Sequence, residues 1–347
     1  MTSQNWILKQ KIDAPYIIAE AGVNHNGKLE LALKLVEIAK QAGADAVKFQ
    51  TFTAENLSRK DTPKVDYQLN RDVTRSHFEM LKNLELNYED HHQVIEFCRK
   101  MKIDFISTPY SFKDAVFLES LKVGIFKTAS ADIVDLRLQE FIASTNSVAL
   151  VSTGMASELE IQTAYRVYER TNMGQLVFLH ATSEYPAPIE NSKVRRVAWL
   201  RDNFNCEVGF SDHTNSNHSA ILALAFGARI FEKHITLDKN DLGPDHFASL
   251  NRDEFSQYVD DLNYSYLALS NSVFDLSPAE MQMKQTSRKS ITAISPIGVG
   301  DQLILDKNIQ LLRPGTGLDG SHLEQVKNKI ANRSIQSGED IKLEDLN

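Results

Sequence analysis

Short apolar runs recur along the first 269 residues, and the segments between them carry helical spacing. The first run lies within residues 15–20 and predicts a buried strand that ends at Glu20. The segment after it places Leu31, Leu35 and Ile38 on one helical face, and Gly43 ends that pattern. This stretch predicts one strand followed by one helix.

The same alternation repeats seven more times. The further predicted strands are residues 46–50, 104–108, 125–128, 148–152, 176–180, 207–211 and 230–234. Eight alternating strands and helices predict a TIM (β/α)8 barrel, closed by an amphipathic helix at residues 255–269. A dinucleotide-binding sheet is disfavoured, because no Gly-x-Gly-x-x-Gly follows the first strand.

A long polar insertion separates the second and third predicted strands, at residues 51–90. It contains Asp-Thr-Pro-Lys at 61–64 and Tyr-Gln-Leu-Asn at 67–70. We expect this insertion to form a flap over the mouth of the barrel.

The tail has a different character from the barrel pattern. Residues 270–286 resemble a linker with helix-start residues at 277–280, and residues 287–347 show short strands and turns. The predicted organisation is therefore a barrel domain at 1–269, the linker, and a small domain at 287–347. A core of that size would gain stability by packing against a larger body.

Composition narrows the function classes. Of the 347 residues, 42% are hydrophobic, but no run of about 18 apolar residues occurs and the first residues lack a signal-peptide pattern. A net charge of -8 argues against nucleic acid as the main partner. Cys98 and Cys206 fit no disulfide or metal motif and are interpreted as ordinary thiols. These features predict a cytoplasmic protein that binds neither membranes nor nucleic acid.

Polar side chains gather at the carboxyl ends of the predicted strands, where active sites of such barrels lie. They are Glu20, Lys48, Gln50, Thr108, Lys127, Ser130, Ser152, Thr153, His180, Ser211, His213, Glu232 and His234. A buried lysine is costly without an anion, so Lys48 and Lys127 indicate a small ligand with carboxylate and phosphate groups. The structural alternative is that both lysines form ion pairs with Glu20 and Glu232.

Two of these strand ends carry histidines, His213 and His234. If their strands are neighbours, the imidazoles lie close enough to bind one divalent metal ion and leave coordination positions for water and substrate. The alternative is that each histidine is a hydrogen-bonded loop residue, because no short His-x-x-His pattern is present.

Several separate motifs resemble the N-acetylneuraminate (sialic acid) synthase family. They are Ile-Ile-Ala-Glu-Ala-Gly-Val-Asn-His-Asn-Gly at 17–27, Val-Lys-Phe-Gln at 47–50, Ser-Thr-Gly-Met at 152–155, Ser-Asp-His-Thr at 211–214, Glu-Lys-His at 232–234 and Gly-Pro-Asp-His at 243–246. In the tail, Arg-Pro-Gly-Thr-Gly at 313–317 resembles the antifreeze-like (SAF) domain of these enzymes.

The resemblance implies that phosphoenolpyruvate condenses with an open-chain N-acetylated hexosamine, N-acetylmannosamine, to give N-acetylneuraminate and phosphate. It also implies a metal at His213 and His234, manganese or else magnesium or cobalt, and a role for Glu20 toward the sugar and the attacking water. Carried over position by position, the substrate contacts fall into three groups. The carboxylate contacts are Lys48, Thr108, Lys127 and Ser152; the phosphate contacts are Ser130, Ser183 and Ser211; the sugar contacts are Gln50, Tyr185 and Asp245.

The resemblance further implies that Arg313 reaches the barrel mouth of a partner subunit, in a homodimer with swapped C-terminal domains. Two departures from the family pattern affect the phosphate side: Ser183 replaces asparagine of some members, and Ser-Ala-Asp at 130–132 replaces the usual Ser-Gly-Glu.

Two competing functions stay open at this stage. One is synthesis of N,N'-diacetyllegionaminate from a 2,4-diacetamido-2,4,6-trideoxy hexose, which shares the chemistry and the Thr-x-Glu-Tyr-Pro-Ala-Pro motif at 182–188. The other is a non-catalytic sugar-acid sensor, which would lack Glu20 or the histidine pair. All three residues are present, and this favours an enzyme.

Overall fold

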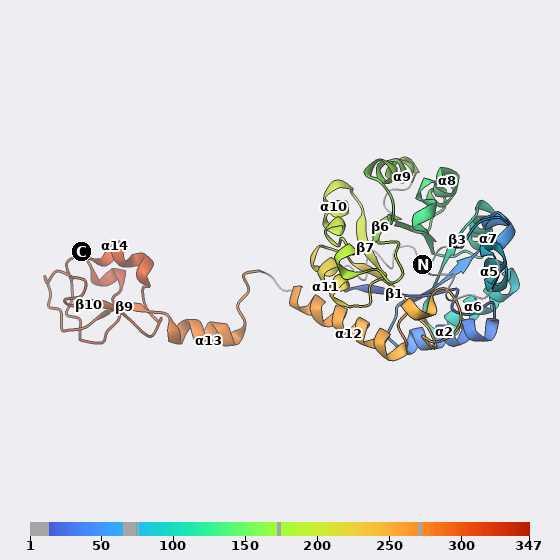
Figure 1. Ribbon diagram of the computed structural model, residues 1–347. Helices are drawn as coiled ribbons and strands as arrows, with labels where there is room; N and C mark the ends of the chain where they lie inside the picture. The colour runs from blue at the N-terminus through green and yellow to red at the C-terminus, as the bar shows by residue number, and fades with distance from the viewer. Residues whose placement is uncertain (1–13, 65–73, 75, 172–174, 270–272) are drawn as a thin grey trace. The chain divides into compact units, whose positions relative to one another are not determined.

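The larger part of the chain is a closed barrel of parallel strands (Figure 1). The computed structural model describes residues 14–64, 74, 76–171, 175–269 and 273–347. The barrel strands are β1 (Tyr16–Gly22), β2 (Ala46–Thr51), β3 (Asp104–Pro109), β4 (Ile125–Thr128), β5 (Val148–Ser152), β6 (Leu176–Ala181), β7 (Glu207–Asp212) and β8 (Ile230–His234). They pair in sequential order, and β1 pairs with β8 to close the ring. The predicted TIM barrel is confirmed, with strand ends within two residues of the prediction.

Helices surround the strands on the outside, as Figure 1 shows. They are α2 (Leu29–Gln41), α6 (Tyr88–Met101), α7 (Phe112–Ser120), α8 (Leu136–Ser144), α9 (Glu158–Thr171), α10 (Arg195–Asn203), α11 (His218–Ala225) and α12 (Arg252–Leu269). In the described part of the chain, no helix combines the length and the apolar character needed to cross a lipid bilayer.

Side chains alternate along each strand between the inside and the outside of the barrel. Outward residues such as Phe49, Phe178 and Phe231 pack against the helices in one large cluster. A separate cluster fills the lower interior, with members that include Ile18, Ile106, Leu150, Leu179 and Ile230.

One inward position nearer the carboxyl end, the interior becomes polar. The residues two positions after Ile18, Ile106, Leu150 and Ile230 are Glu20, Thr108, Ser152 and Glu232, all of them buried. The barrel interior therefore has an apolar floor and a polar upper layer, and that layer holds the predicted site.

The described residues of the insertion after β2 include the helices α3 (Ala54–Leu57) and α5 (His77–Leu84). Its small core joins Met80 and Leu84 to Val23 and Phe52, which directly follow β1 and β2. This packing anchors the insertion to the rim at the carboxyl ends of the strands. Residues 67–70 of the predicted flap lie outside the described residues.

Residues 271–347 form a second compact unit. It contains α13 (Pro278–Ser287), an antiparallel pair of β9 (Ser290–Ala293) and β10 (Ile309–Leu312), and α14 (Leu323–Val326). Ser277 caps α13 together with Glu280, as the helix-start pattern predicted. Helix α13 thus occupies the second half of the segment interpreted as a linker.

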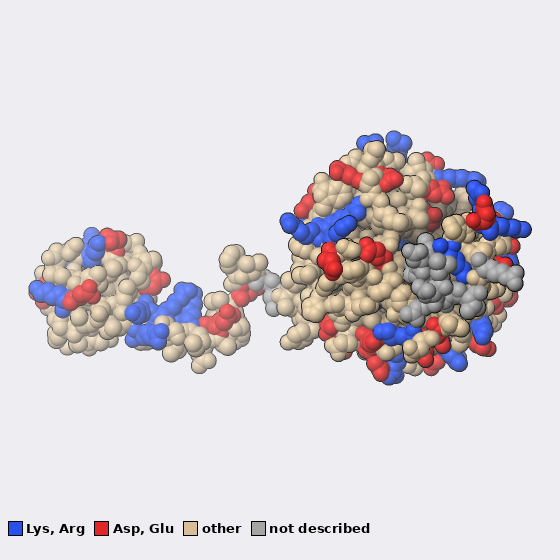
Figure 2. Space-filling model, viewed as in Figure 1, with Lys and Arg blue, Asp and Glu red and all other residues tan. Residues whose placement is uncertain are grey.

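The loop that carries Arg313 is attached to the end of α13. The Gly315 N–H donates to the Gln285 carbonyl at 2.7 Å, and the Ser290 hydroxyl donates to the Pro314 carbonyl at 2.8 Å. Figure 2 shows Lys and Arg side chains gathered on the smaller unit near the end of α13, whereas both signs of charge are mixed on the visible face of the larger unit.

Candidate active site

Two lysines and two glutamates form a buried ion network in the polar upper layer. Lys48 Nζ lies 2.8 Å from Glu20 Oε2 and 3.6 Å from Glu232 Oε2, and Lys127 Nζ lies 4.0 Å from Glu232 Oε1. None of these residues is more than 4% exposed. The ion pairs of the structural alternative are therefore present. Anion binding by the lysines stays a prediction. A bound anion would contact Lys48 and Lys127 in addition to the two glutamates.

Burial and charge separate the proton affinities of these groups. Burial raises the pKa of Glu20 to about 7, against the opposing effect of Lys48. Burial would raise the pKa of Glu232 too, but Lys127, Lys48 and the Ser211 hydroxyl outweigh it and hold that pKa at about 2. Burial lowers the pKa of Lys127 to about 8. Glu20 is thus the carboxylate able to exchange a proton near neutral pH.

Three predicted residues converge around Gly22. This glycine has a φ of +52°, and a Cβ built there would lie 3.3 Å from Glu20 Oε1, 3.4 Å from Gln50 Nε2 and 3.5 Å from Asp245 Oδ2. The Gln50 amide donates to Glu20 at 3.2 Å. Burial raises the pKa of Asp245 to about 6, opposed by Lys48. The structure brings Glu20, Gln50 and Asp245 together, although Glu20 and Asp245 lie 225 residues apart in the sequence.

Two of the three predicted phosphate residues converge at Gly154, on the loop after β5. A Cβ at Gly154 would lie 2.6 Å from both Ser130 Oγ and Ser183 Oγ. The Gly154 N–H donates to Ser130 at 3.1 Å. Ser211 instead donates to Glu232 at 2.8 Å. Only glycine fits between the two hydroxyls, so Ser130 and Ser183 form a small cradle of two hydroxyls against the Gly154 backbone.

Of the two remaining predicted carboxylate contacts, Thr108 touches the ion network. Its hydroxyl accepts a hydrogen bond from Lys48 Nζ at 3.0 Å. Ser152 is buried at the same level of the interior, at the end of β5. Both side chains therefore occupy the polar upper layer.

The two candidate metal ligands face one region of the mouth. The rings of His213 and His234 have centroids 5.8 Å apart, and the Tyr185 ring lies 4.2 Å from His213 and 5.9 Å from His234. His213 Nδ1 contacts the Thr182 carbonyl at 2.6 Å, so Nδ1 carries the proton and Nε2 carries the lone pair. His234 Nδ1 is buried and has no hydrogen-bond partner among the described residues.

Both imidazoles are held neutral, the form that binds metals. Burial lowers the pKa of His213 to about 4, and burial together with His213 lowers the pKa of His234 well below its usual range. An orphaned ring nitrogen beside an oriented neutral imidazole fits a divalent cation. No group of three or more His, Cys, Asp or Glu side chains in the described ranges is arranged to hold a metal, so this pair would leave positions for oxygen ligands.

Two strand-end residues of the predicted set point away from the mouth. His180 lies with its ring 5.7 Å from Phe210 of the outer cluster, and its Nε2 contacts the Ser192 carbonyl at 2.8 Å. Thr153 donates to the Leu179 carbonyl at 3.2 Å. The expectation that they line the mouth is wrong, because each occupies an outward position in the alternation of its strand.

Tyr110 and Asp132 join the site without having been predicted as site residues. Burial raises the pKa of Tyr110 well above its usual range, with Asp132 and Glu20 as the next contributors. Burial raises the pKa of Asp132 to about 6, and its Oδ2 has no partner among the described residues. Tyr110 lies two residues after the predicted strand 104–108, and this position was the signal that would have found it.

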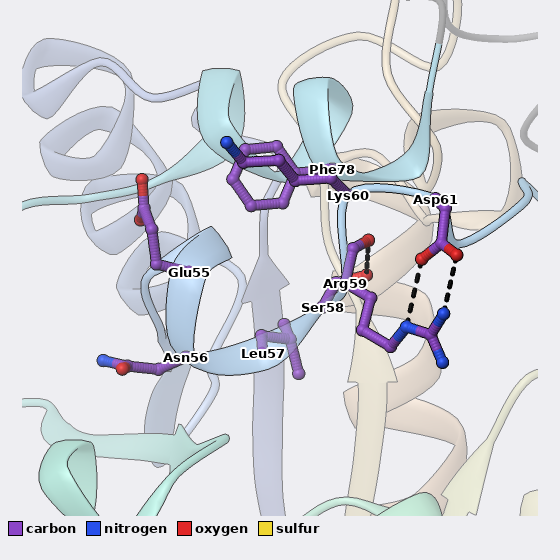
Figure 3. Close-up of a pocket in the computed structure, with 8 residues that line it drawn as sticks. All are labelled: Glu55, Asn56, Leu57, Ser58, Arg59, Lys60, Asp61 and Phe78. Carbon is purple, nitrogen blue, oxygen red and sulfur yellow. Dashed lines mark hydrogen bonds and ion pairs between the residues drawn. The ribbon is translucent and has the colours of Figure 1, made fainter.

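An open pocket of about 570 Å³ lies on the insertion, away from these groups (Figure 3). Its lining residues are Glu55, Asn56, Leu57, Ser58, Arg59, Lys60, Asp61 and Phe78. Arg59 and Asp61 form an exposed ion pair there at 2.6 Å. None of the predicted site residues lines this pocket.

Neither cysteine belongs to the site. Cys98 and Cys206 are both free, and burial raises the pKa of each thiol to about 12. This confirms their interpretation as ordinary thiols.

Comparisons with known proteins agree with the motifs. The NeuB family model matches residues 35–273. N,N'-diacetyllegionaminic acid synthase of Campylobacter jejuni is 37% identical over 93% of this chain and 97% of its own length. The protein of that name from Legionella pneumophila is 38% identical over 93% of this chain and 92% of its own length.

Among solved structures, N-acetylneuraminic acid synthetase of Leptospira borgpetersenii superposes with a TM-score of 0.70 at 28% identity. The match covers 78% of this chain and 90% of that one. With the family model spanning most of the barrel and relatives aligned over nine-tenths of the sequence, the chain belongs to the NeuB family of nonulosonic acid synthases and is an enzyme.

Proposed function

We propose that this enzyme is an N,N'-diacetyllegionaminate synthase, which condenses phosphoenolpyruvate with a 2,4-diacetamido-2,4,6-trideoxy hexose in its open-chain form. The observation that carries the choice of sugar is the pair of legionaminic acid synthases, each about nine-tenths aligned with this chain. The family resemblance gives N-acetylmannosamine as the first expectation, but the motifs do not separate the two sugars, and these relatives favour the diacetamido sugar. The solved N-acetylneuraminic acid synthetase keeps N-acetylmannosamine as the second candidate.

The geometry supports a site with two ends for the two substrates. Lys48, Lys127, Thr108 and Ser152 provide cations and hydroxyls for the carboxylate of phosphoenolpyruvate. The hydroxyls of Ser130 and Ser183 form the cradle for its phosphate, and the Gly154 N–H holds Ser130 in place. Glu20 lies next to Lys48 and, together with Gln50 and Asp245, forms the sugar side of the site, where a sugar with several hydroxyls finds acceptors and a donor.

In the proposed reaction, carbon 3 of phosphoenolpyruvate attacks the aldehyde carbon of the sugar, and the aldehyde oxygen becomes a hydroxyl. Water adds to carbon 2, and phosphate leaves with cleavage of its carbon–oxygen bond, which gives the 2-keto acid. Glu20 has a pKa of about 7 and lies beside Gln50 and Asp245, so its carboxylate can take the proton from that water. Lys48 and Lys127 hold the carboxylate of phosphoenolpyruvate in place.

We also propose that the enzyme uses a divalent cation, with manganese as the first candidate. When bound, it supplies Lewis-acid polarisation of the aldehyde oxygen. His213 and His234 would hold it, and the Thr182 carbonyl keeps the Nε2 lone pair of His213 available. Tyr185 packs against His213 and limits the space in which the sugar lies.

We further propose a homodimer in which the smaller unit is an antifreeze-like domain and presents Arg313 to the barrel of the partner. The attachment of the Arg313 loop to α13 supports this, because the loop and the helix then move as one piece. A guanidinium can donate to the carbonyl of an acetamido group.

The experiment that tests the sugar is a comparison of kcat/KM for the diacetamido sugar and for N-acetylmannosamine, with phosphoenolpyruvate saturating. We expect a preference of at least about 100-fold for the diacetamido sugar, since a site built around a second acetamido group leaves polar groups unpaired without it. A preference for N-acetylmannosamine would replace the legionaminate assignment with N-acetylneuraminate synthesis. Turnover of neither sugar, by a protein that binds phosphoenolpyruvate, would contradict both.

A further inference from the structure

The residue before each candidate metal histidine belongs to a buried ion pair on the outer side of the barrel wall. Asp212 precedes His213 at the end of β7, and Lys233 precedes His234 at the end of β8. The two are direct partners in the register of these strands. Lys233 Nζ lies 3.0 Å from Asp212 Oδ2, and the two side chains are 1% and 0% exposed.

Apart from Thr214, the side chains around this pair are mainly aromatic and apolar. The preceding outward residues on the same two strands are Phe210 and Phe231, both buried in the cluster between barrel and helices. On the helix side, Lys233 Nζ lies 5.6 Å from the ring centroid of Tyr258 in α12. Burying these two charges costs hydration free energy, and their mutual attraction roughly offsets that cost. Apolar side chains of similar size would therefore give the folded state comparable stability. Stability alone therefore does not account for it.

The hydrogen bonds of this pair instead fix the backbone at the ends of the two strands. Lys233 Nζ donates to the Thr214 carbonyl as well as to Asp212. Asp212 Oδ1 accepts from the Thr214 N–H at 2.9 Å and from its hydroxyl at 2.8 Å. These hydrogen bonds link the end of β7, the end of β8 and the turn after His213. Apolar contacts, which have no preferred direction, would not hold the three segments in one arrangement.

The same backbone is held from the mouth side as well. The His213 carbonyl accepts from the Ala187 N–H at 2.8 Å, and its ring contacts the Thr182 carbonyl. His213 therefore has its main chain and its ring constrained on both sides of the wall. The His234 carbonyl accepts from the Leu250 N–H at 2.9 Å, but its ring Nδ1 has no hydrogen-bond partner among the described residues. On the outer side of the wall, the neighbouring Lys233 adds the contact with Asp212 and Thr214.

We infer that the Asp212–Lys233 pair is a positioning device, which sets the separation and direction of the His213 and His234 imidazoles for a divalent cation. The inference rests on the proposed function, because the cation is part of that proposal. Asp212 and Lys233 face away from the mouth and touch neither substrate, so they act only through the two histidines.

The test separates positioning from stability with three variants of the full chain. Lys233→Met and Asp212→Asn each remove one charge, and the double variant removes both without leaving a buried charge unpaired. The surface pair Lys239 and Glu254, 3.0 Å apart but about two-fifths exposed, provides the control Lys239→Met/Glu254→Gln. The measurements are the Tm in chelator and the dissociation constant for Mn²⁺ without substrates, the latter by electron paramagnetic resonance of free Mn²⁺.

We expect both single variants to lower the Tm by at least about 5 °C and the double variant to recover most of that loss. The double variant should nevertheless bind Mn²⁺ about 10- to 100-fold more weakly than the wild type, as for other residues that orient metal ligands. Binding of phosphoenolpyruvate without metal and all properties of the surface control should stay unchanged.

Wild-type Mn²⁺ affinity in the double variant would overturn the inference and leave the pair with a structural role only. Should the double variant fail to fold, Asp212→Asn decides in the same way, since asparagine keeps the acceptor for Thr214. If the wild type binds no Mn²⁺, or His213→Ala binds it equally well, the metal part of the proposed function falls and takes this inference with it. The wild type and His213→Ala both keep Asp212 and Lys233, so they test the metal alone. A failure of the proposed metal site can therefore be distinguished from a failure of the positioning role.

Discussion

Glu20 and Lys48 are register partners on β1 and β2, and their charged groups meet at 2.8 Å inside the barrel. The same carboxylate also accepts from Gln50 on the sugar side. Glu20 therefore stands between the two proposed substrates, and this position makes it the first residue to test.

Glu20→Gln should keep the fold, since an amide oxygen still accepts from Lys48, but it should lower kcat at least about 100-fold because the proton acceptor is lost. The affinity for phosphoenolpyruvate, measured by calorimetry, should stay within about threefold of the wild-type value. Glu207→Gln, an exposed carboxyl at the start of β7, is the matched control. Wild-type turnover in Glu20→Gln would remove this residue from the mechanism.

The pH dependence of kcat/KM for phosphoenolpyruvate should be bell-shaped. Glu20 must be ionised to accept a proton, so activity falls as the pH drops through about 7. Lys127 must be protonated to hold the carboxylate, so activity also falls as the pH rises through about 8. In Lys127→Arg the alkaline limb should disappear, since a guanidinium stays charged. A profile that is flat from about pH 6 to 9 would contradict both assignments.

Chelation followed by removal of the chelator should abolish turnover, and Mn²⁺ should restore it. His213→Ala and His234→Ala should bind Mn²⁺ at least about 10-fold more weakly, because each removes one of the two proposed protein ligands. His92→Ala, an exposed histidine on α6, is the control. Full activity of a protein shown to be metal-free would exclude the metal from the reaction.

Reaction in oxygen-18 water should leave the released phosphate unlabelled, because the proposed water adds to carbon 2 and the carbon–oxygen bond breaks. The label should appear in the keto acid, in a sample analysed before exchange with solvent. Mass spectrometry of the phosphate decides the point. Labelled phosphate would mean attack at phosphorus and a different role for the Ser130–Ser183 cradle.

Arg313 should act in trans. Mixing Arg313→Ala subunits with Glu20→Gln subunits should restore activity toward about one quarter of the wild-type value, because half of the dimers are mixed and each has one complete site. Re-formed homodimers of each variant serve as the baseline. Mixed dimers that show no recovery would place Arg313 in cis or outside the site.

The barrel could be predicted because its signal is local. Each apolar run, such as 46–50, is short and is followed by one helical segment, so strand number and order follow from counting. Glu20 and His234 follow from the same pattern as polar residues that end a predicted strand, and Lys48 follows as a charged residue inside one.

Other features depend on contacts that no local pattern carries. The position of His180 at a strand end does not say whether its side chain faces the inside or the outside of the barrel, and in the structure it faces the outside. The convergence of Ser130 and Ser183 depends on Gly154, which provides the space between two distant loops. The partners of Lys127 were predicted only as an alternative to anion binding, and ion pairing over 105 residues of sequence became visible only in the closed barrel.

The two-tier interior of the barrel has an evolutionary consequence. The apolar floor of Ile18, Ile106 and Leu150 holds the strands together, whereas sugar recognition is assigned to side chains above it and to the loops. If Gln50 and Tyr185 contact the sugar as proposed, substitutions there would change the accepted sugar without altering this apolar floor. A lineage could then exchange one nine-carbon sugar acid for another in small steps while the residues that hold the strands together stay the same.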